Sequence, residues 1–475
     1  MKDLRHFIGQ LEQNEELVRI KKEVDWDIEL GAISRRVYDQ YGPCLWFEKI
    51  KDYPQGYTVI NGECGTWRRV AIAMGLDANT PLREIYEEYE KRIEGRVQPN
   101  IVDRKAAPCK ENVFIGEQAD IYRLPAPLIH EGDGGRYIGT WDAVITKDPE
   151  TNWTNWGMYR FMIHNQNFLA GWPQTTSQFA MMLNEKYVPK NQPMPVALVI
   201  GSHPLDHMVA TAPMRPGVNE AEVAGSLRGE PVDLVKCETS EIMVPANAEI
   251  IIEGEIPTDA IVPDGPFGEY PGFRSGTMAE GVAFRIKAIT HRNNPILSMT
   301  ALGAPVDDSS IAASLTAAVG MKLGLQRRGI DVTDVYVPPE GVTHLVIVGV
   351  RTGGIEVTKK VLDFFIARRV MVSKVIVVDK DVDVFDMKQW IHAFATKCHP
   401  GRSIVVEHFV GKSNALTPCY DAEERRILKG AFAAFDATWP LEWPKENIPP
   451  RATFKEIYSQ ETQDKVLAKW HEYGF

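Results

Sequence analysis

The sequence predicts a mixed α/β protein, α+β overall, because strand and helix patterns change character twice along the chain. Helical and strand patterns alternate over roughly the first 100 residues, short β-type runs fill residues 115–305, and strand and helix patterns alternate again from residue 343 onward. At 475 residues the chain has about three times the usual domain length of ~150 residues, so two or three packed domains are expected.

The N-terminal part is expected to be α/β. Apolar residues recur at helical spacing from Leu4 to Leu11 and again over residues 28–38, and residues 17–20 between them are typical of a short strand. Residues 82–93 (LREIYEEYEKRI) predict a third, strongly charged helix. The punctuating segment GRVQPN at 95–100 indicates that the first domain ends shortly after it.

The middle of the chain is expected to be β-rich. Its clearest runs are PVALVIG (195–201), HMVATAP (207–213), AEIIIEGEI (248–256) and VAFRIKAITHR (282–292). Runs of this length and spacing suggest a barrel or a strongly curved sheet. His203 and His207 are four residues apart, but Pro204 argues against a helix there.

The last third is expected to begin with one long linking helix over residues 309–328, with Asp307, Asp308 or Ser309 as its N-cap and Gly329 at its C-cap. Strand and helix patterns then alternate over residues 343–350, 355–369, 373–383, 387–398 and 403–410. A βαβαβ unit with a parallel sheet is the natural fold for this alternation. A Pro-rich stretch and a final helix follow, as a packing or oligomerisation arm. The expected parts are therefore residues 1–110, 111–305, 306–330 (the linker helix) and 331–475.

Composition excludes several function classes. Acidic residues outnumber basic ones by 64 to 53, which gives a formal net charge of -11. A sequence-independent nucleic-acid binder needs a surplus of Lys and Arg, so no nucleic-acid partner is expected, and a membrane role is equally unsupported. The charged N-terminus is unlike a signal peptide, and no apolar run reaches the ~20 residues of a bilayer span. Six scattered cysteines without a CxxC pair favour reduced thiols in a cytoplasmic protein.

Two short segments carry candidate chemistry: WTNWGMYR at residues 153–160 and DGPFGEYPG at residues 264–272. Glycine and proline force the second into a compact loop that holds Asp264 and Glu269 on either side of Phe267. Two carboxyl groups held in this way can perform acid–base chemistry when their environments push their pKa values apart, for example when a guanidinium keeps one of them ionised. A surface turn with solvated acids is the alternative interpretation.

The sequence lacks other common catalytic signatures. The glycine-rich segment EGDGGRYIG at residues 131–139 lacks the GxGxxG spacing of a dinucleotide-binding turn, and we interpret it as a tight turn. Neither HExxH nor GxSxG occurs in the chain, so zinc proteolysis and serine hydrolysis have no support.

In this order and at this separation, WTNWxxxR and DGPFGE resemble the signature of the UbiD family of reversible decarboxylases. The blocks at residues 212–255 and 373–386 agree, and the resemblance extends over essentially the whole chain. Within the family the chain is most similar to the C subunits of bacterial phenolic-acid decarboxylases, which act on 4-hydroxybenzoate or vanillate. The resemblance implies a carboxy-lyase with a central flavin-binding split β-barrel and a C-terminal α/β oligomerisation domain.

The resemblance also implies the cofactors: prenylated FMN, held through its phosphate by a divalent metal, usually manganese, and often by potassium. Asn155 and Glu220 match the family's metal ligands, and Lys374 matches a lysine that reaches the cofactor phosphate. Some members have a further histidine ligand after a Pro-Gln pair. Here no histidine follows Gln174, so Gln174 itself or a water is left as the third ligand.

The family's catalytic residues can be matched in the same way. Arg160, Asp264 and Glu269 match an acid–arginine–acid network in which Glu269 is the proton donor. Residues Met158 to Arg160 would line the flavin, with Tyr159 between them. Asp264 stands where fungal cinnamic-acid members have glutamate, so the contact of this shorter side chain with Arg160 is an open point.

The implied partners are an aromatic acid substrate, a flavin prenyltransferase that supplies the cofactor, small B and D subunits, and further copies of the chain in a dimer or hexamer. Two alternatives stay open at this point. One is a decarboxylase of an acrylic or polyprenyl-hydroxybenzoic acid. The other is a non-catalytic flavin carrier or assembly subunit, which would need the phosphate site but not the acid network.

Overall fold

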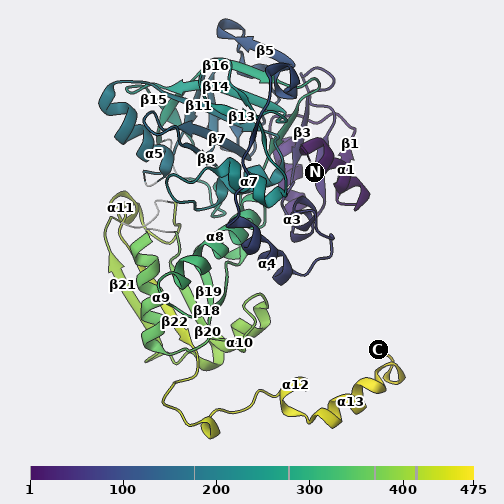
Figure 1. The fold of residues 1–475 in the computed structure, drawn as a ribbon, viewed down its shortest axis with the longest axis vertical. Coiled ribbons are helices and arrows are strands. Elements are labelled where there is room, and N and C mark those ends of the chain that lie inside the picture. Colours follow the sequence, from purple (N-terminus) through teal and green to yellow (C-terminus); the bar gives the residue numbers. More distant parts are fainter. Residues whose placement is uncertain (1, 176, 276–278, 369–370, 412–415) are drawn as a thin grey trace.

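The computed structural model of the chain describes residues 2–175, 177–275, 279–368, 371–411 and 416–475. In Figure 1 the N-terminal and central elements form one body, and the C-terminal sheet lies below it with helix α8 at the junction. The final segment extends away from both. This mixed arrangement of helices and sheets confirms the predicted fold class.

The N-terminal part contains the predicted helices and strand. Its elements are α1 (Leu4–Gln13), β1 (Leu17–Ile20), α2 (Glu29–Tyr38), β2 (Cys44–Phe47), β3 (Thr58–Asn61), α3 (Trp67–Ala73) and α4 (Leu82–Ile93). Helix α1 forms because Asp3 caps it, accepting a hydrogen bond from the His6 amide, and because its apolar stripe is buried. Its four-stranded sheet has the order β1-β2-β3-β17, so a strand from the end of the central region, β17 (Ile296–Met299), completes it.

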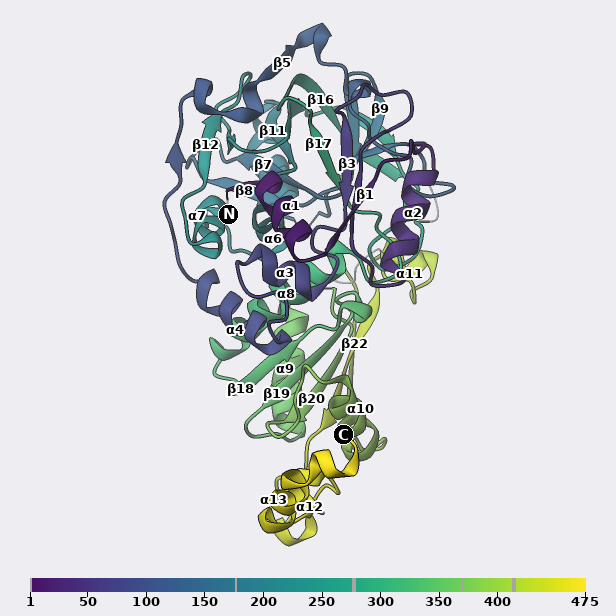
Figure 2. The ribbon, with the colours of Figure 1, turned by 90° about the vertical axis from the view of Figure 1, so that its right-hand side faces the viewer.

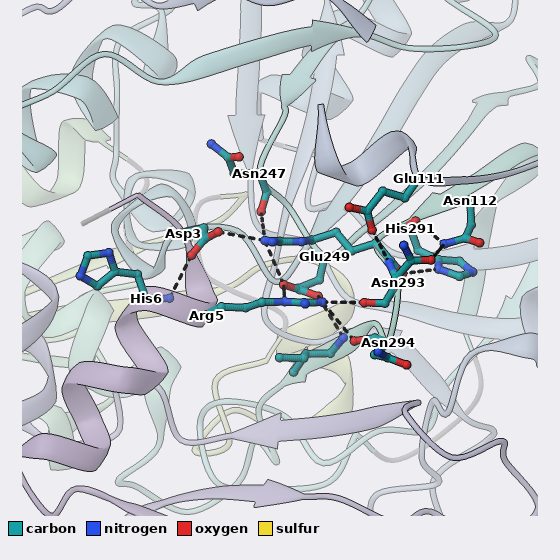
Figure 3. A network of polar contacts seen from close by, with 12 residues as sticks. Asp3, Arg5, His6, Glu111, Asn112, Asn247, Glu249, His291, Asn293 and Asn294 are labelled. Atoms are coloured by element: carbon teal, nitrogen blue, oxygen red, sulfur yellow. Dashed lines mark hydrogen bonds and ion pairs between the residues drawn. The ribbon is translucent and has the colours of Figure 1, made fainter. Parts of the chain in front are cut away.

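A polar network joins helix α1 to the central sheet (Figure 3). The Arg5 guanidinium donates to both Glu249 oxygens, each at 2.8 Å, and the Glu249 side chain is fully buried. Arg292 donates to Asp3 at 2.9 Å and lies 3.4 Å from Glu249. One buried carboxylate is therefore shared by two arginines from distant parts of the chain, which fixes the start of the chain against the sheet.

The central part is a ten-stranded sheet that curls on itself, as predicted for this β-rich region. Its main path is β6-β9-β10-β16-β14-β11-β7-β8, and β5 and β15 pair with β16. The strands are β5 (Asn112–Ile115), β6 (Tyr137–Gly139), β7 (Asp142–Lys147), β8 (Thr154–Gly157), β9 (Phe161–Asn165), β10 (Phe168–Gly171), β11 (Met194–Ile200), β14 (Ile250–Ile256), β15 (Ile261–Asp264) and β16 (Ala279–His291). A separate three-stranded sheet has the order β13-β12-β4, formed by β13 (Met243–Pro245), β12 (Asp233–Lys236) and β4 (Asn100–Ile101).

Three helices belong to the central part: α5 (Gln178–Met182), α6 (Pro204–Thr211) and α7 (Glu220–Arg228). Helix α6 contradicts the strand predicted over residues 207–213 and the argument against a helix at Pro204. Pro204 stands at the first helical position, where its missing N–H costs no hydrogen bond, and His203 Nδ1 caps the helix by accepting from the Leu205 amide at 3.1 Å. All residues from Pro204 to Ala210 are buried, so the helix has no polar face to reveal its period.

The linker and C-terminal elements largely follow the predicted alternation. They are α8 (Asp308–Gln326), β18 (Val332–Tyr336), β19 (Leu345–Val350), α9 (Ile355–Arg368), β20 (Lys374–Asp379), α10 (Met387–Lys397), β21 (Ile404–Phe409), α11 (Ala422–Arg426) and β22 (Gly430–Ala437). The sheet has the order β18-β19-β20-β22-β21. Only β19, β20 and β22 are parallel, whereas β21 runs antiparallel to β22 at the edge, so the all-parallel sheet predicted through residues 403–410 is wrong.

The chain ends in an extended arm that carries α12 (Phe454–Ile457) and α13 (Gln460–Ala468). Neither helix has a buried residue, and both views show the arm standing away from the C-terminal sheet (Figure 2). Across the described ranges, no helix combines the length and the apolar character that a membrane crossing requires.

Candidate functional site

A cavity of about 270 Å³ lies where the central sheet meets the start of α8. It is lined by Thr140, Met158, Tyr159, Arg160, Trp172, Gln174, Ser177, Glu269, Tyr270, Leu302, Ser309 and Leu416. A larger cavity of about 660 Å³ beside α1 contains ion pairs of Arg19 with Glu12 and Glu48, but none of the residues predicted to be functional. The smaller cavity therefore holds the candidate site.

Arg160 joins two carboxyl groups at the wall of this cavity. Its Nη1 lies 2.7 Å from Asp264 Oδ1 and 2.5 Å from Asp264 Oδ2, and its Nε donates to Glu269 Oε1 at 2.9 Å. The side chains of Asp264 and Glu269 are 0% and 5% exposed. The structure thus brings together the three residues predicted to be catalytic, and the shorter side chain of Asp264 still reaches Arg160. A turn with solvated acids is excluded.

Burial sets the proton affinity of both acids. It raises the pKa of Asp264 and of Glu269, and the positive charge of Arg160 opposes this rise in each case. Asp264 receives the two close contacts from Nη1, whereas Glu269 receives one and is further raised by the charge of Asp264. Asp264 is therefore the better candidate for the ionised form and Glu269 for the protonated form.

The loop that carries these acids is built for one conformation. Asp264 ends strand β15, and Gly265 follows with a φ of +80°, a region that favours glycine. The Phe267 ring is buried, with its centroid 4.0 Å from that of Tyr137. Two hydrogen bonds also join Phe267 to Ser275: the Ser275 amide donates to the Phe267 carbonyl at 2.9 Å, and the Phe267 amide donates to Ser275 Oγ at 2.9 Å. The packing of the Phe267 ring and the hydrogen bonds between Phe267 and Ser275 thus fix the loop that carries the Asp264 and Glu269 carboxyl groups.

The two predicted metal ligands come from elements that pack against each other. Asn155 is in β8, Glu220 is the first residue of α7, and the Glu220 carboxyl accepts from the backbone amide of Trp156. Both are buried, yet Glu220 Oε2 and the Asn155 amide Nδ2 have no hydrogen-bond partner. The amide can be turned to present its oxygen at the same position. Burial raises the pKa of Glu220 to about 8, although backbone hydrogen bonds and the charge of Arg96 oppose this rise.

These two residues fit a hard divalent cation, which prefers carboxylate and amide oxygens and would satisfy both orphaned positions. Two protein ligands alone leave room for other oxygens, such as those of a phosphate. Within the residues that the structure describes, no cluster of three or more His, Cys, Asp or Glu could hold a metal. A metal at this site would therefore need further oxygen ligands of another kind, such as the Gln174 amide, a water or a phosphate.

The residues predicted to contact the cofactor divide into two groups. Met158, Tyr159 and Gln174 line the cavity together with Arg160. Lys374 does not belong to the lining. It begins β20, with its Nζ 3.3 Å from Ser373 Oγ, and its role at the cofactor phosphate stays a prediction.

Sequence reasoning missed Tyr137. Its hydroxyl lies 3.4 Å from Arg160 Nη1 and 3.5 Å from Asp264 Oδ1, and burial raises its pKa far above the usual range. The sequence signal for it is its position in the glycine-rich segment 131–139, for which the pattern predicts only a tight turn.

Three family models match the chain. They are the N-terminal, Rift-related and C-terminal domains of 3-octaprenyl-4-hydroxybenzoate carboxy-lyase (UbiD), and they match residues 8–89, 100–305 and 310–437. Together they span most of the chain and contain Asn155, Arg160, Glu220, Asp264 and Glu269.

Relatives of known activity are similar over the whole length. Pyrrole-2-carboxylic acid decarboxylase of Pseudomonas aeruginosa is 30% identical and aligns with 100% of this chain and 98% of its own. The closed form of vanillic acid decarboxylase of Sedimentibacter hydroxybenzoicus superposes with a TM-score of 0.88 at 31% identity, covering 99% of both chains. An evolved dimeric form of the UbiD-class enzyme HmfF from Pelotomaculum thermopropionicum, in complex with prFMN, gives a TM-score of 0.79 at 27% identity over 94% of this chain and 97% of that one.

Proposed function

The chain belongs to the UbiD family of carboxy-lyases, and on that premise we propose that it decarboxylates a phenolic acid, such as 4-hydroxybenzoate or vanillate, reversibly to the phenol and CO₂. Members of this family decarboxylate aromatic or acrylic acids. The choice of a phenolic acid as substrate is supported by the similarity to vanillic acid decarboxylase over the whole chain.

One observation carries the proposal: Arg160 holds two buried carboxyl groups, Asp264 and Glu269, at the wall of a cavity. A protein that only stored or carried a flavin would need a phosphate site but would gain nothing from this network. Burying two acids beside one arginine costs stability, which is a reason to expect a catalytic role for them.

The chain's residues would act in the following way. The Arg160 guanidinium remains charged at all relevant pH values and keeps Asp264 ionised through its two contacts. The Glu269 carboxyl faces the same cavity, and burial raises its pKa and so favours its protonated form. When the bond between the ring carbon and the carboxylate breaks, CO₂ leaves and its bonding electron pair stays with the carbon. The proton of Glu269 then takes the place of CO₂ on that carbon.

No side chain can accept the electron pair that CO₂ leaves behind, so a cofactor is chemically necessary. Prenylated FMN, bound in this cavity, would supply that electron sink. Met158, Tyr159 and Gln174 would hold its ring system, and Asn155 and Glu220 would hold a divalent metal, such as manganese, that binds its phosphate. Potassium is a further candidate cation beside the Met214 carbonyl, which here accepts from Gln178 at 2.7 Å.

The test is to co-express the chain with a flavin prenyltransferase, with and without small B and D subunits, and to record the absorbance spectrum of the purified protein. CO₂ release is then followed from 4-hydroxybenzoate, vanillate, pyrrole-2-carboxylate and ferulate. We expect a prenylated-flavin spectrum and turnover of the two phenolic acids.

The panel separates the alternatives. Turnover of only pyrrole-2-carboxylate or ferulate would retain the family activity and refute the phenolic assignment. A protein that binds the prenylated flavin but releases no CO₂ from any acid would be a carrier, and the catalytic proposal would be wrong.

A further inference from the structure

The glycine-rich segment that precedes β6 packs directly onto the loop of the two acids. The Gly134 amide donates to the Pro266 carbonyl at 2.7 Å, and Arg274 Nη1 donates to the Glu131 carbonyl at 2.9 Å. A Cβ atom at Gly134 would lie 1.9 Å from the Gly265 carbonyl oxygen. The close approach of these two backbones therefore requires glycine at this position.

Asp133 lies at the centre of this contact. Its Oδ1 accepts from the Gly268 amide at 3.0 Å, the amide directly before Glu269. Its Oδ2 accepts from the His130 amide at 3.0 Å and lies 2.9 Å from His130 Nδ1. The Asp133 side chain is fully buried. A buried carboxylate with both oxygens engaged is a rigid attachment point for the backbone it binds.

His130 supports this attachment from the other side. Its ring lies edge-on to the Phe267 ring, with centroids 5.8 Å apart. A Cβ atom at Gly268 would lie 2.5 Å from His130 Nδ1, so the ring occupies the space above the Gly268 backbone. The Asp133 carboxylate and the His130 imidazole thus both contact the loop between Asp264 and Glu269.

We propose that Asp133, oriented by His130, is a positioning residue for Glu269: it fixes the backbone of the proton donor and keeps a negative charge beside its carboxyl. This inference rests on the proposed role of Glu269 as proton donor. It assigns a function to the segment EGDGG, which has no other role in the site.

Among the described residues, the charged groups that act on Glu269 are Arg160, Asp264 and Asp133, and Tyr137 contacts Arg160. Asp133 acts in the same direction as Asp264 and raises the pKa of Glu269. Because the protonated form donates the proton, kcat/KM is expected to fall as pH rises through this pKa. Removal of the Asp133 charge lowers the pKa of Glu269 and moves this alkaline limb to lower pH.

Two substitutions separate position from charge. Asp133→Asn keeps an oxygen for the Gly268 amide but removes the charge, so the alkaline limb should move to lower pH while the maximal kcat stays within about threefold. Asp133→Ala removes both the accepting oxygen and the charge, so kcat should fall on the order of tenfold or more. Asp120→Ala is the control, because Asp120 also accepts from a backbone amide, that of Tyr122 at 2.9 Å, but in an exposed local turn outside the cavity. It should change neither quantity.

A second measurement does not depend on activity. Amide hydrogen exchange of the peptide that contains Gly268 and Glu269 is followed by mass spectrometry in the protein without cofactor. It should accelerate on the order of tenfold in Asp133→Ala and stay near the wild-type rate in Asp133→Asn. If Asp133→Ala does not fold, the shift of the alkaline limb in Asp133→Asn decides alone.

Unchanged exchange in Asp133→Ala together with an unmoved alkaline limb in Asp133→Asn would overturn the inference. Failure of the proposed function has a different signature. In that case the wild-type holoenzyme releases no CO₂ from any acid of the panel, while the exchange experiment still reports whether Asp133 holds the loop.

Discussion

Replacement of Arg160 by glutamine should remove the central charge of the candidate site. Three short contacts would be lost: those to the two oxygens of Asp264 at 2.7 and 2.5 Å and that to Glu269 at 2.9 Å. Both acids would remain buried, without a cation. Removal of one partner from a buried ion pair costs about 3–5 kcal/mol of unfolding free energy, because the charge left behind is uncompensated.

The loss should depend on pH. In the wild type, burial already raises the pKa of Asp264 and Glu269 above the ordinary values of 3.8 and 4.5 for these side chains. Without Arg160 the pKa values of Asp264 and Glu269 in the folded protein rise further. Between the pKa values of the unfolded chain and those of the folded variant, the folded variant therefore binds more protons than the unfolded chain. Its stability therefore falls as pH rises through that range. The loss of unfolding free energy in Arg160→Gln, compared with the wild type, should be smallest at about pH 4 and largest at neutral and alkaline pH.

The assay is urea unfolding followed by tryptophan fluorescence at several pH values, together with CO₂ release by the holoenzyme. Lys110→Met is the matched control. Lys110 pairs with Glu253 at 2.8 Å, both side chains are 1% exposed, and neither lines the cavity. It should lose similar stability but retain turnover. The reasoning is refuted if Arg160→Gln stays within about 0.5 kcal/mol of wild type at neutral pH, or if its turnover is unchanged.

Three further outcomes are expected. Glu269→Gln should retain the bound cofactor, but its rates of decarboxylation and of exchange of the substrate hydrogen for deuterium should fall by at least about 100-fold. The control variant Glu280→Gln, on the adjacent strand β16, should keep both rates. Full turnover in Glu269→Gln would contradict its role as proton donor. Asn155→Ala or Glu220→Ala should lose metal and flavin together, measured by metal analysis and absorbance, and retention of both in normal ratio would remove this site. Glu249→Gln should lower the unfolding free energy by about 2–3 kcal/mol, because Arg5 and Arg292 lose their shared carboxylate, with no change in turnover.

Local pattern was enough to predict elements with a polar and an apolar face. Helices α1 and α4 were predicted nearly to the residue because their buried positions recur with the helical period. Helix α6 was missed because every residue from Pro204 to Ala210 is buried. The orientation of β21 could not be read from its own residues either, since it depends on pairing with β22, a strand that follows later in the chain.

The site was predicted to a similar extent. The spacing of glycine and proline indicated that Asp264 and Glu269 are held in one loop, but their burial beside Arg160 is a tertiary fact. Tyr137 and Asp133 reach that loop from more than 100 residues away. No local signal marks such contacts, so the segment around Asp133 was interpreted as an ordinary turn.

The arrangement of the chain explains why the acid network and the cofactor site would act together. Asn155 lies in strand β8 and Arg160 lies just before strand β9, so one short stretch of backbone carries both the candidate metal ligand and the arginine that holds the two acids. The overall charge of -11 opposes the approach of an anionic acid, and the charge of Arg160 is already engaged by Asp264 and Glu269. Attraction of the substrate carboxylate therefore has to come from short-range contacts inside the cavity and from a bound cation, rather than from the field of the protein. Under the proposed function, a divalent cation held by Asn155 and Glu220 would supply part of this attraction.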